Sequence, residues 1–322
     1  MGTKPLRSTP LAIRCGVPQG SILGPLLFLI FINDLPLSLP NSNVVLYADD
    51  TSSLNSAVTS EVLFSNAKNS IVHMSQWCHE NNLSLNINKS SFMQFHCKIS
   101  PPTCCPWLTL NNHTIQRSYS VKFLGLHLTE DLDWTTHIEH ISNKAATGIY
   151  MIRKLRPITT ATTLKMVYYA NVHSHLMYGV IFWGNTRAAT KAFSLQKKSI
   201  KAILGVSVRT PGKPIFEALG ILPLPCIYIL QCSMLVKTNP SLFPTNSDYH
   251  PYMTRGRGNI HVFGHNLEYF WRGPLHPASQ IYNQLPSSLK SVSSPAIFKS
   301  RLCKILHRKL YYSLSEYLND KL

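Results

Sequence analysis

Two adjacent carboxylates, Asp49 and Asp50, are the residues of this sequence with the clearest potential for chemistry. They stand between the apolar run Asn43–Ala48 and the segment Thr51–Leu54, a pattern that predicts two strands of a β-hairpin with the acids at its tip. Two like charges repel each other, and a hard divalent cation such as Mg²⁺ would offset that repulsion. Two such ions about 3.5–4 Å apart can hold the attacking and leaving oxygens of a phosphoryl displacement. Aspartate also favours ordinary solvated turns, so the surrounding sequence must decide between the two interpretations.

The elements expected to position this pair lie on both sides of it. The loop Gly16–Ser21 contains two glycines and a proline, which break regular structure. Periodicity and composition predict the following further elements: a short strand Leu11–Cys15, a buried helix Leu23–Leu35, an amphipathic helix 58–80 ended by Asn81-Asn82, a strand pair at 83–87 and 92–95, and a strand Val121–Leu128 interrupted by Gly125.

The second half of the chain has a helical pattern. Residues 134–205 are expected to be mostly helical, with breaks at Pro157 and Gly184. A Pro/Gly-rich linker or bend is expected at Pro211–Pro225, and a final basic amphipathic helix at Phe298–Leu318. The sequence therefore predicts an α+β fold, with its strands concentrated before residue 129.

The charge distribution predicts a polyanionic partner. The formal net charge is +17, and residues 129–250 and 251–322 each carry a net +7. Such a balance suits nucleic acid or an anionic membrane surface. The longest apolar run, Pro25–Ile32, is too short for a bilayer span of about 20 residues. None of the eight cysteines forms a Cys-x-x-Cys pair, so we expect a soluble, reduced, intracellular protein without a zinc site.

Several segments resemble motifs of the reverse transcriptases of non-LTR (LINE-type, jockey-like) retrotransposons. The segments are Gly16–Phe28 with Ile32–Pro36 (motif B), Leu46–Asp50 (motif C), Trp77–Ser90 (motif D) and Val121–Leu126 with Trp134 (motif E). Looser similarity continues through Tyr178-Gly179, Trp183-Gly184 and Leu195–Lys198 to Asn283–Pro286 and Phe298-Lys299. The resemblance implies the C-terminal portion of an RNA-directed DNA polymerase: a partial palm over 1–128, a helical thumb-like region over 129–237 and a basic C-terminal region over 238–322.

The same resemblance assigns roles to individual residues. Asp49 and Asp50 would bind two Mg²⁺ ions, with Mn²⁺ as an alternative, and Lys89 would protonate the leaving pyrophosphate. Contacts with the template and the incoming dNTP are implied for Pro18, Gln19, Gly20, Ser21, Tyr47 and Ala48, and a primer grip for Leu124 and Gly125. The basic residues expected to hold the backbone of the RNA template and DNA primer are Lys144, Arg153, Lys154, Lys197, Lys198 and Lys201. The family relation also implies nuclear localisation, and the short apolar runs predict no membrane contact.

One residue that the resemblance requires is missing from its place. The family has a further essential aspartate, in a motif before Gly16–Ser21, whereas residues 1–15 contain no acidic residue. We therefore expect the chain alone not to polymerise. Two alternatives stay open at this point: a non-catalytic nucleic-acid-binding remnant of a mobile element, and a decayed copy that leaves apolar surface exposed and forms no stable protein.

Overall fold

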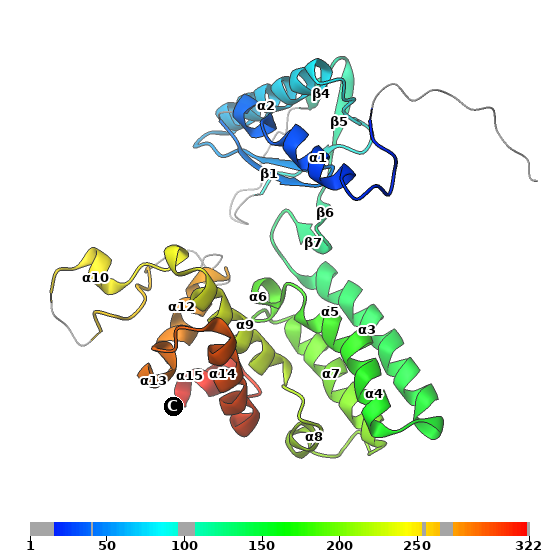
Figure 1. Cartoon of the computed structure of the whole chain (residues 1–322), viewed down its shortest axis with the longest axis vertical. Coiled ribbons are helices and arrows are strands. Elements are labelled where there is room, and N and C mark those ends of the chain that lie inside the picture. Colours follow the sequence, from blue (N-terminus) through cyan, green and yellow to red (C-terminus); the bar gives the residue numbers. More distant parts are fainter. Residues whose placement is uncertain (1–15, 40, 96–106, 253–255, 265–272, 321–322) are drawn as a thin grey trace, which may run out of the picture. The chain divides into compact units, whose positions relative to one another are not determined.

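The computed structural model describes residues 16–39, 41–95, 107–252, 256–264 and 273–320, and the expected strand Leu11–Cys15 lies outside them. The chain divides into two compact units, residues 1–119 and residues 120–322 (Figure 1). Helices dominate, and the strands form small sheets, so the predicted α+β class is confirmed.

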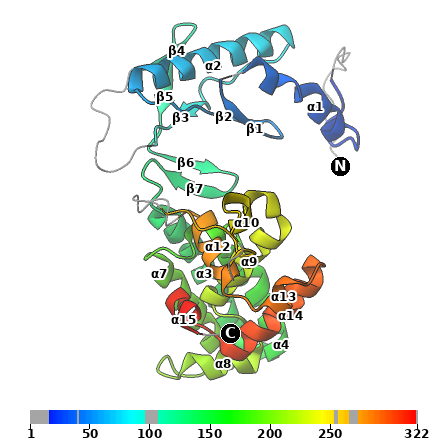
Figure 2. The same cartoon turned by 90° about the vertical axis from the view of Figure 1, so that its left-hand side faces the viewer.

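The first unit combines two helices with two small sheets (Figure 2). Strands β1 and β2 form an antiparallel hairpin, and β3, β5 and β4 form a second sheet in that order, with β3 parallel to β5. The bounds of the elements in this unit are α1 Gly24–Ile32, the 3₁₀ turn η1 Leu35–Ser38, β1 Asn43–Tyr47, β2 Asp50–Leu54, α2 Ser60–Glu80, β3 Ser91–Phe92, β4 Leu108–Leu110 and β5 His113–Arg117.

Helix α2 organises the two small cores of this unit. Its Met74, Trp77 and Cys78 are buried with residues of α1 and η1, while its Phe64, Ala67 and Ile71 pack against the β4–β5 sheet. The Thr59 hydroxyl caps the helix by accepting a hydrogen bond from the Val62 amide at 3.4 Å. The predicted helix over 58–80, and its end at Asn81-Asn82, are confirmed.

Helix α1 is present as predicted, but the expectation that it is buried is wrong. Of its residues only Ile32 is buried, and Leu26, Leu27, Leu29 and Ile30 are exposed. The helix is apolar on all sides, whereas α2 and η1 cover it only near its C-terminal end. Strand β1 is likewise half-exposed rather than buried, because the β1–β2 hairpin has no third strand among the described residues.

The strand predicted at 83–87 is also wrong. These residues form a loop that ends in a turn, where the Asn86 side chain accepts a hydrogen bond from the Lys89 amide at 3.2 Å and the Asn86 carbonyl accepts one from the Ser90 hydroxyl at 2.8 Å. Asparagine competes with strand pairing through such local hydrogen bonds. Leu85 and Ile87 still reach the cores, so their alternation reflects burial without a strand.

The second unit is a helical body that begins with a β-hairpin (Figure 1). Its elements are β6 Ser120–Phe123, β7 Leu126–Thr129, α3 Thr135–Leu155, the 3₁₀ turn η2 Arg156–Ile158, α4 Ala161–Tyr168, the π-turn η3 Tyr169–His173, α5 Ser174–Met177, α6 Val180–Trp183, α7 Ala189–Leu204, α8 Gly212–Leu219, α9 Leu224–Thr238, η4 Pro240–Leu242, α10 Asn246–Tyr249, α12 Leu275–Asn283, α13 Ser287–Lys290, α14 Pro295–Lys309 and α15 Leu314–Asn319.

A single hydrophobic core runs through this unit. Helix α9 lies at its centre, with nine buried residues, and packs against α12, α14 and α6. Helices α3, α4 and α7 pack together in the region drawn in green in Figure 1. The predicted helical character of residues 134–205, with Pro157 in a 3₁₀ turn, is confirmed.

Three sequence expectations for the second unit need correction. Val121–Leu128 is a hairpin rather than one strand, because Leu124 and Gly125 both take positive φ, 45° and 87°, and turn the chain back. The segment 211–225, expected to be a linker or bend, is no linker: it contains helix α8, whose Ile215 and Phe216 join the core, and the chain bends by 56° between α8 and α9. The final helix breaks at Leu310, with a φ of 49°, into α14 and α15.

No single helix among the described residues has both the length and the apolar character needed to cross a bilayer. Helices α8 and α9 have the required length and apolar character only when they are taken together, and they are bent by 56° relative to each other.

Candidate active site

The β1–β2 hairpin presents the carboxylate pair at its tip, as predicted. Tyr47 pairs with Asp50, so Ala48 and Asp49 form a two-residue turn and Asp50 is the first residue of β2. Both aspartates are exposed. Ala48 has a φ of 51°, a left-handed conformation that costs a non-glycine residue on the order of 1–3 kcal/mol. Backbone strain of this kind is typical of functional turns.

The carboxylates have the right chemistry for Mg²⁺ but supply only part of a coordination shell. Magnesium prefers six oxygen ligands and commonly takes one or two carboxylates together with substrate phosphates. Among the residues that the structure describes, no group of three or more His, Cys, Asp or Glu side chains gathers where a metal could bind. By themselves, Asp49 and Asp50 could therefore supply only part of the oxygen ligands that a magnesium ion requires.

The loop expected to contact template and nucleotide is exposed and built around glycines. Gly16 and Gly20 have φ values of 88° and 86°, which side-chain-bearing residues rarely adopt. The Ser21 amide donates to the Pro18 carbonyl at 3.1 Å, and the Ser21 hydroxyl accepts a hydrogen bond from the Gly24 amide at 3.0 Å. Ser21 therefore connects the loop to the first turn of α1, while Pro18 to Gly20 face solvent.

Lys89, the predicted general acid, lies in the turn that follows Asn86. Its side chain is exposed, and its backbone amide is held by the Asn86 side chain at 3.2 Å. This local hydrogen bond fixes the backbone of the turn and leaves the ammonium group accessible.

The predicted primer grip, Leu124 and Gly125, is the tip of the β6–β7 hairpin. The Tyr178 hydroxyl donates a hydrogen bond to the Leu124 carbonyl, and a Cβ placed on Gly125 would lie 3.3 Å from the Tyr178 ring. Gly179 has a φ of 61°, which other residues rarely adopt, and it packs so closely on the hairpin that an added Cβ would lie 2.6 Å from the Leu126 side chain. The pair Tyr178-Gly179 therefore holds the hairpin tip against the helical body.

Trp183 supports that contact from within the core. It is completely buried, and its indole nitrogen donates to the Tyr178 carbonyl at 3.1 Å. The sequence motif Tyr-Gly followed by Trp-Gly marked these positions, but the sequence alone did not indicate that they fasten the hairpin at Leu124.

A buried histidine, His137 of α3, packs next to strand β7 of the same hairpin. His137 is buried, contacts the Trp134 and Trp183 rings edge-on, and accepts a hydrogen bond at Nδ1 from the His127 amide at 3.4 Å. Burial, with further contributions from His127 and His140, lowers the pKa of His137 from 6.5 to about 4. His137 is thus neutral in the folded protein at physiological pH.

We expect stability to fall on acidification because of His137. Its pKa is lower in the folded than in the unfolded chain, so the unfolded state binds more protons, and stability is lost as the pH falls from about 6.5 towards 4. The full loss is roughly 3 kcal/mol at 1.36 kcal/mol per pKa unit. Urea unfolding at pH 7 and pH 4.5 should show a smaller difference in His137→Asn than in the unmodified chain. An identical pH dependence in the two proteins would contradict this role for His137.

The structure brings three of the six predicted backbone-binding residues together. Arg153 of α3 and Lys198 and Lys201 of α7 line one groove of about 320 Å³, together with Arg156. The other three lie elsewhere. Lys154 lies over the Tyr150 ring, with Nζ 5.7 Å from the ring centre, Lys197 lies over Phe193 at 4.7 Å, and Lys144 is exposed on α3.

Comparison with known proteins identifies a family for the N-terminal part of the chain. Residues 4–128 match the family described as reverse transcriptase (RNA-dependent DNA polymerase). The chain therefore carries a reverse transcriptase domain, and that domain includes the β1–β2 hairpin and the glycine-containing loop. The resemblance inferred from the sequence motifs is confirmed.

The relatives are polymerases of mobile elements of Drosophila. The chain is 27% identical to the RNA-directed DNA polymerase from mobile element jockey of Drosophila melanogaster, over 62% of this chain and 23% of that protein. It is also 27% identical to the probable RNA-directed DNA polymerase from transposon BS of the same species, over 66% of this chain and 25% of that protein. The chain thus spans about a quarter of the length of these relatives. No solved structure gives a significant match.

Proposed function

We propose that this chain is part of an RNA-directed DNA polymerase of a retrotransposon. In this proposal the β1–β2 hairpin belongs to a partial palm and binds the catalytic metal, and the basic helices of residues 120–322 act as a thumb for the RNA template and DNA primer. The observation that carries the proposal is the exposed Asp49-Asp50 pair at a strained hairpin tip, inside the segment that matches the reverse transcriptase family.

The residues divide the work of nucleotidyl transfer between them. Asp49 and Asp50 would hold Mg²⁺ or Mn²⁺, which when bound stabilises charge on the attacking primer oxygen and the leaving pyrophosphate. Gln19 and Gly20 would let the template base and the incoming dNTP approach the backbone, because the loop carries no bulky side chain at Gly20. Lys89 would donate a proton to the pyrophosphate. Such an enzyme acts in the nucleus, as the family relation implies.

A non-catalytic nucleic-acid-binding remnant is the second candidate function. It is favoured by one observation, that only two carboxylates meet at the hairpin among the described residues. The third possibility, a decayed chain without a stable fold, is disfavoured by the continuous core of residues 120–322.

The metal site makes a direct test. We expect Fe²⁺ with ascorbate, used as a Mg²⁺ substitute that cleaves the chain where it binds, to cut close to Asp49 in the intact chain. The double variant Asp49→Ala/Asp50→Ala should lose this cut, because it removes both oxygen ligands. The matched control Asp34→Ala removes an exposed acid of the same unit and should retain it. Cleavage that persists in the double variant would contradict a metal site at the hairpin.

Primer extension completes this test. On a poly(rA) template with an oligo(dT) primer and Mg²⁺ or Mn²⁺, we expect no extension by this chain alone, because an incomplete set of metal ligands costs orders of magnitude in rate. Incorporation that disappears in Asp49→Ala but survives in Asp34→Ala would contradict this expectation. It would show that the chain completes its own metal site.

A further inference from the structure

The groove between the C-terminal ends of α3 and α7 is lined by four positively charged side chains and no negatively charged one among the described residues. It is lined by Arg153 and Arg156 from the end of α3 and the turn after it, and by Lys198 and Lys201 from the last turns of α7. The remaining lining residues are Ala202, Gly205, Val206 and Val208. The part of the chain that the structure describes contributes no carboxylate to the lining of this groove.

Two of these cations are positioned by the backbone of the loop after α7. The Arg156 guanidinium lies directly over Gly205, where an added Cβ would be 1.7 Å from the Arg156 Cζ atom. The Lys201 ammonium donates a hydrogen bond to the Val208 carbonyl. These contacts hold positive charge at the groove wall before any ligand arrives, which lowers the cost of ordering the side chains on binding.

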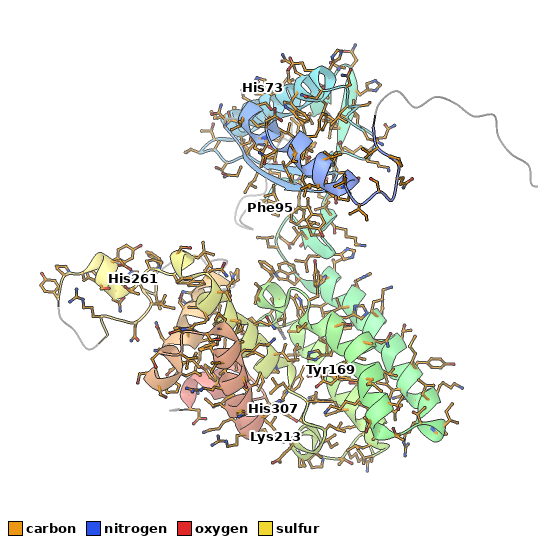
Figure 3. All side chains as sticks on the ribbon, in the orientation of Figure 1. His73, Phe95, Tyr169, Lys213, His261 and His307 are labelled. Atoms are coloured by element: carbon orange, nitrogen blue, oxygen red, sulfur yellow. The ribbon has the colours of Figure 1, made fainter. Side chains whose placement is uncertain are left out.

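Stabilisation of helix ends explains only part of this charge. Each helix C-terminus carries roughly −0.5 of an elementary charge, so α3 and α7 together offset about one of the four cations. Some basic residues elsewhere in the unit have carboxylate partners: Lys213, labelled in Figure 3, lies 2.8 Å from Glu316, and Lys191 lies 3.8 Å from Glu139. The groove therefore keeps an excess of about +3.

This excess selects among phosphate groups. An internal phosphodiester carries one negative charge, whereas a terminal phosphate monoester carries about −1.5 to −2 at pH 7 and offers three acceptor oxygens. Arginine matches such oxygens with its planar fork of donors, and lysine adds a mobile point charge. A monoester thus compensates the groove more completely than a diester does.

We propose that this groove binds the terminal 5′-phosphate of a nucleic-acid strand. The proposal rests on the proposed function, because it assumes that the helices of this unit hold a template–primer duplex. The new element is that Arg153, Arg156, Lys198 and Lys201 recognise one end of a strand. The chemical nature of that end, as well as the length of the nucleic acid, should therefore determine affinity.

The test compares two RNA–DNA hybrids that differ only in a 5′-phosphate or a 5′-hydroxyl, labelled at the opposite end and titrated with the full chain at constant ionic strength. We expect about tenfold tighter binding of the phosphorylated hybrid, the worth of one charge-assisted hydrogen bond. Arg156→Ala/Lys198→Ala should remove that preference. The matched control Arg187→Ala/Lys191→Ala removes the same number and types of charge near the start of α7, away from the groove, and should retain the preference.

Each outcome has a definite meaning. Equal affinity for the two hybrids, or a preference that survives in Arg156→Ala/Lys198→Ala, would overturn the 5′-phosphate site while leaving the proposed function intact. Failure of both hybrids to bind would overturn both proposals. Inorganic phosphate is titrated separately by calorimetry: binding of phosphate that the groove variant loses, without any preference between the hybrids, would assign the groove to free phosphate and overturn recognition of a strand end.

Discussion

Replacing Trp183 with alanine is expected to lower the free energy of unfolding of residues 120–322 by about 3–5 kcal/mol, the usual cost of truncating a buried tryptophan. Trp183 is completely buried, contacts His137 edge-on with ring centres 6.1 Å apart, and donates to the Tyr178 carbonyl. The substitution removes the packing, leaves a cavity and frees one hydrogen-bond acceptor. Because Tyr178 in turn holds the Leu124 carbonyl, the hairpin tip should loosen as well.

Urea unfolding followed by far-ultraviolet circular dichroism measures this loss, since most helical residues lie in the second unit. Trp107→Ala is the matched control, because Trp107 is 74% exposed, and it should change the midpoint little. Hydrogen exchange at residues 120–129 reports the hairpin separately and should accelerate in Trp183→Ala only. Equal, small effects of the two tryptophan substitutions would contradict the role of Trp183 in holding Tyr178 and the β6–β7 hairpin.

The sequence was informative where a local pattern determines the structure. The hairpin over Asn43–Leu54 follows from an apolar run ended by two aspartates, and the helix over 58–80 follows from helical periodicity; both are local patterns. The position of Asp49 at the turn follows from the point where that apolar run ends. The loop around Gly16 and Gly20 could also be predicted, because two glycines and a proline break regular structure; in the structure both glycines take a φ that other residues avoid.

Features that depend on distant contacts were beyond the sequence. The exposure of α1 depends on how much of its apolar surface α2 can cover, and its composition says nothing about that. Helix α8 was taken for a linker or bend because Pro211, Gly212 and Gly220 flank a short apolar segment, and packing of Phe216 into the core stabilises it. The split at Leu310 requires a positive φ at a leucine, which no local preference predicts.

The candidate site could be predicted only in part, because some of its contacts join residues that are far apart in the sequence. Motif similarity identified Leu124 and Gly125, but their support by Tyr178 joins residues 54 positions apart. Likewise, Arg153, Lys198 and Lys201 were chosen as basic residues on helices, and the parallel ends of α3 and α7 bring them into one groove with Arg156. Lys144, Lys154 and Lys197 are also basic residues on predicted helices, so the sequence could not distinguish them from the residues of the groove. The packing of the helices makes that distinction.

The central claim is that the basic helices of residues 120–322 hold nucleic acid through its phosphates, and salt dependence tests it most directly. If about four cations on these helices neutralise phosphates, the logarithm of the affinity for an RNA–DNA hybrid should fall with a slope of roughly −3 to −4 against the logarithm of salt concentration. Between about 50 and 200 mM salt, this slope corresponds to a loss on the order of 100-fold. Fluorescence anisotropy with a labelled hybrid gives the slope, which should become shallower in Arg156→Ala/Lys198→Ala. An affinity that stays constant over this range would contradict the account.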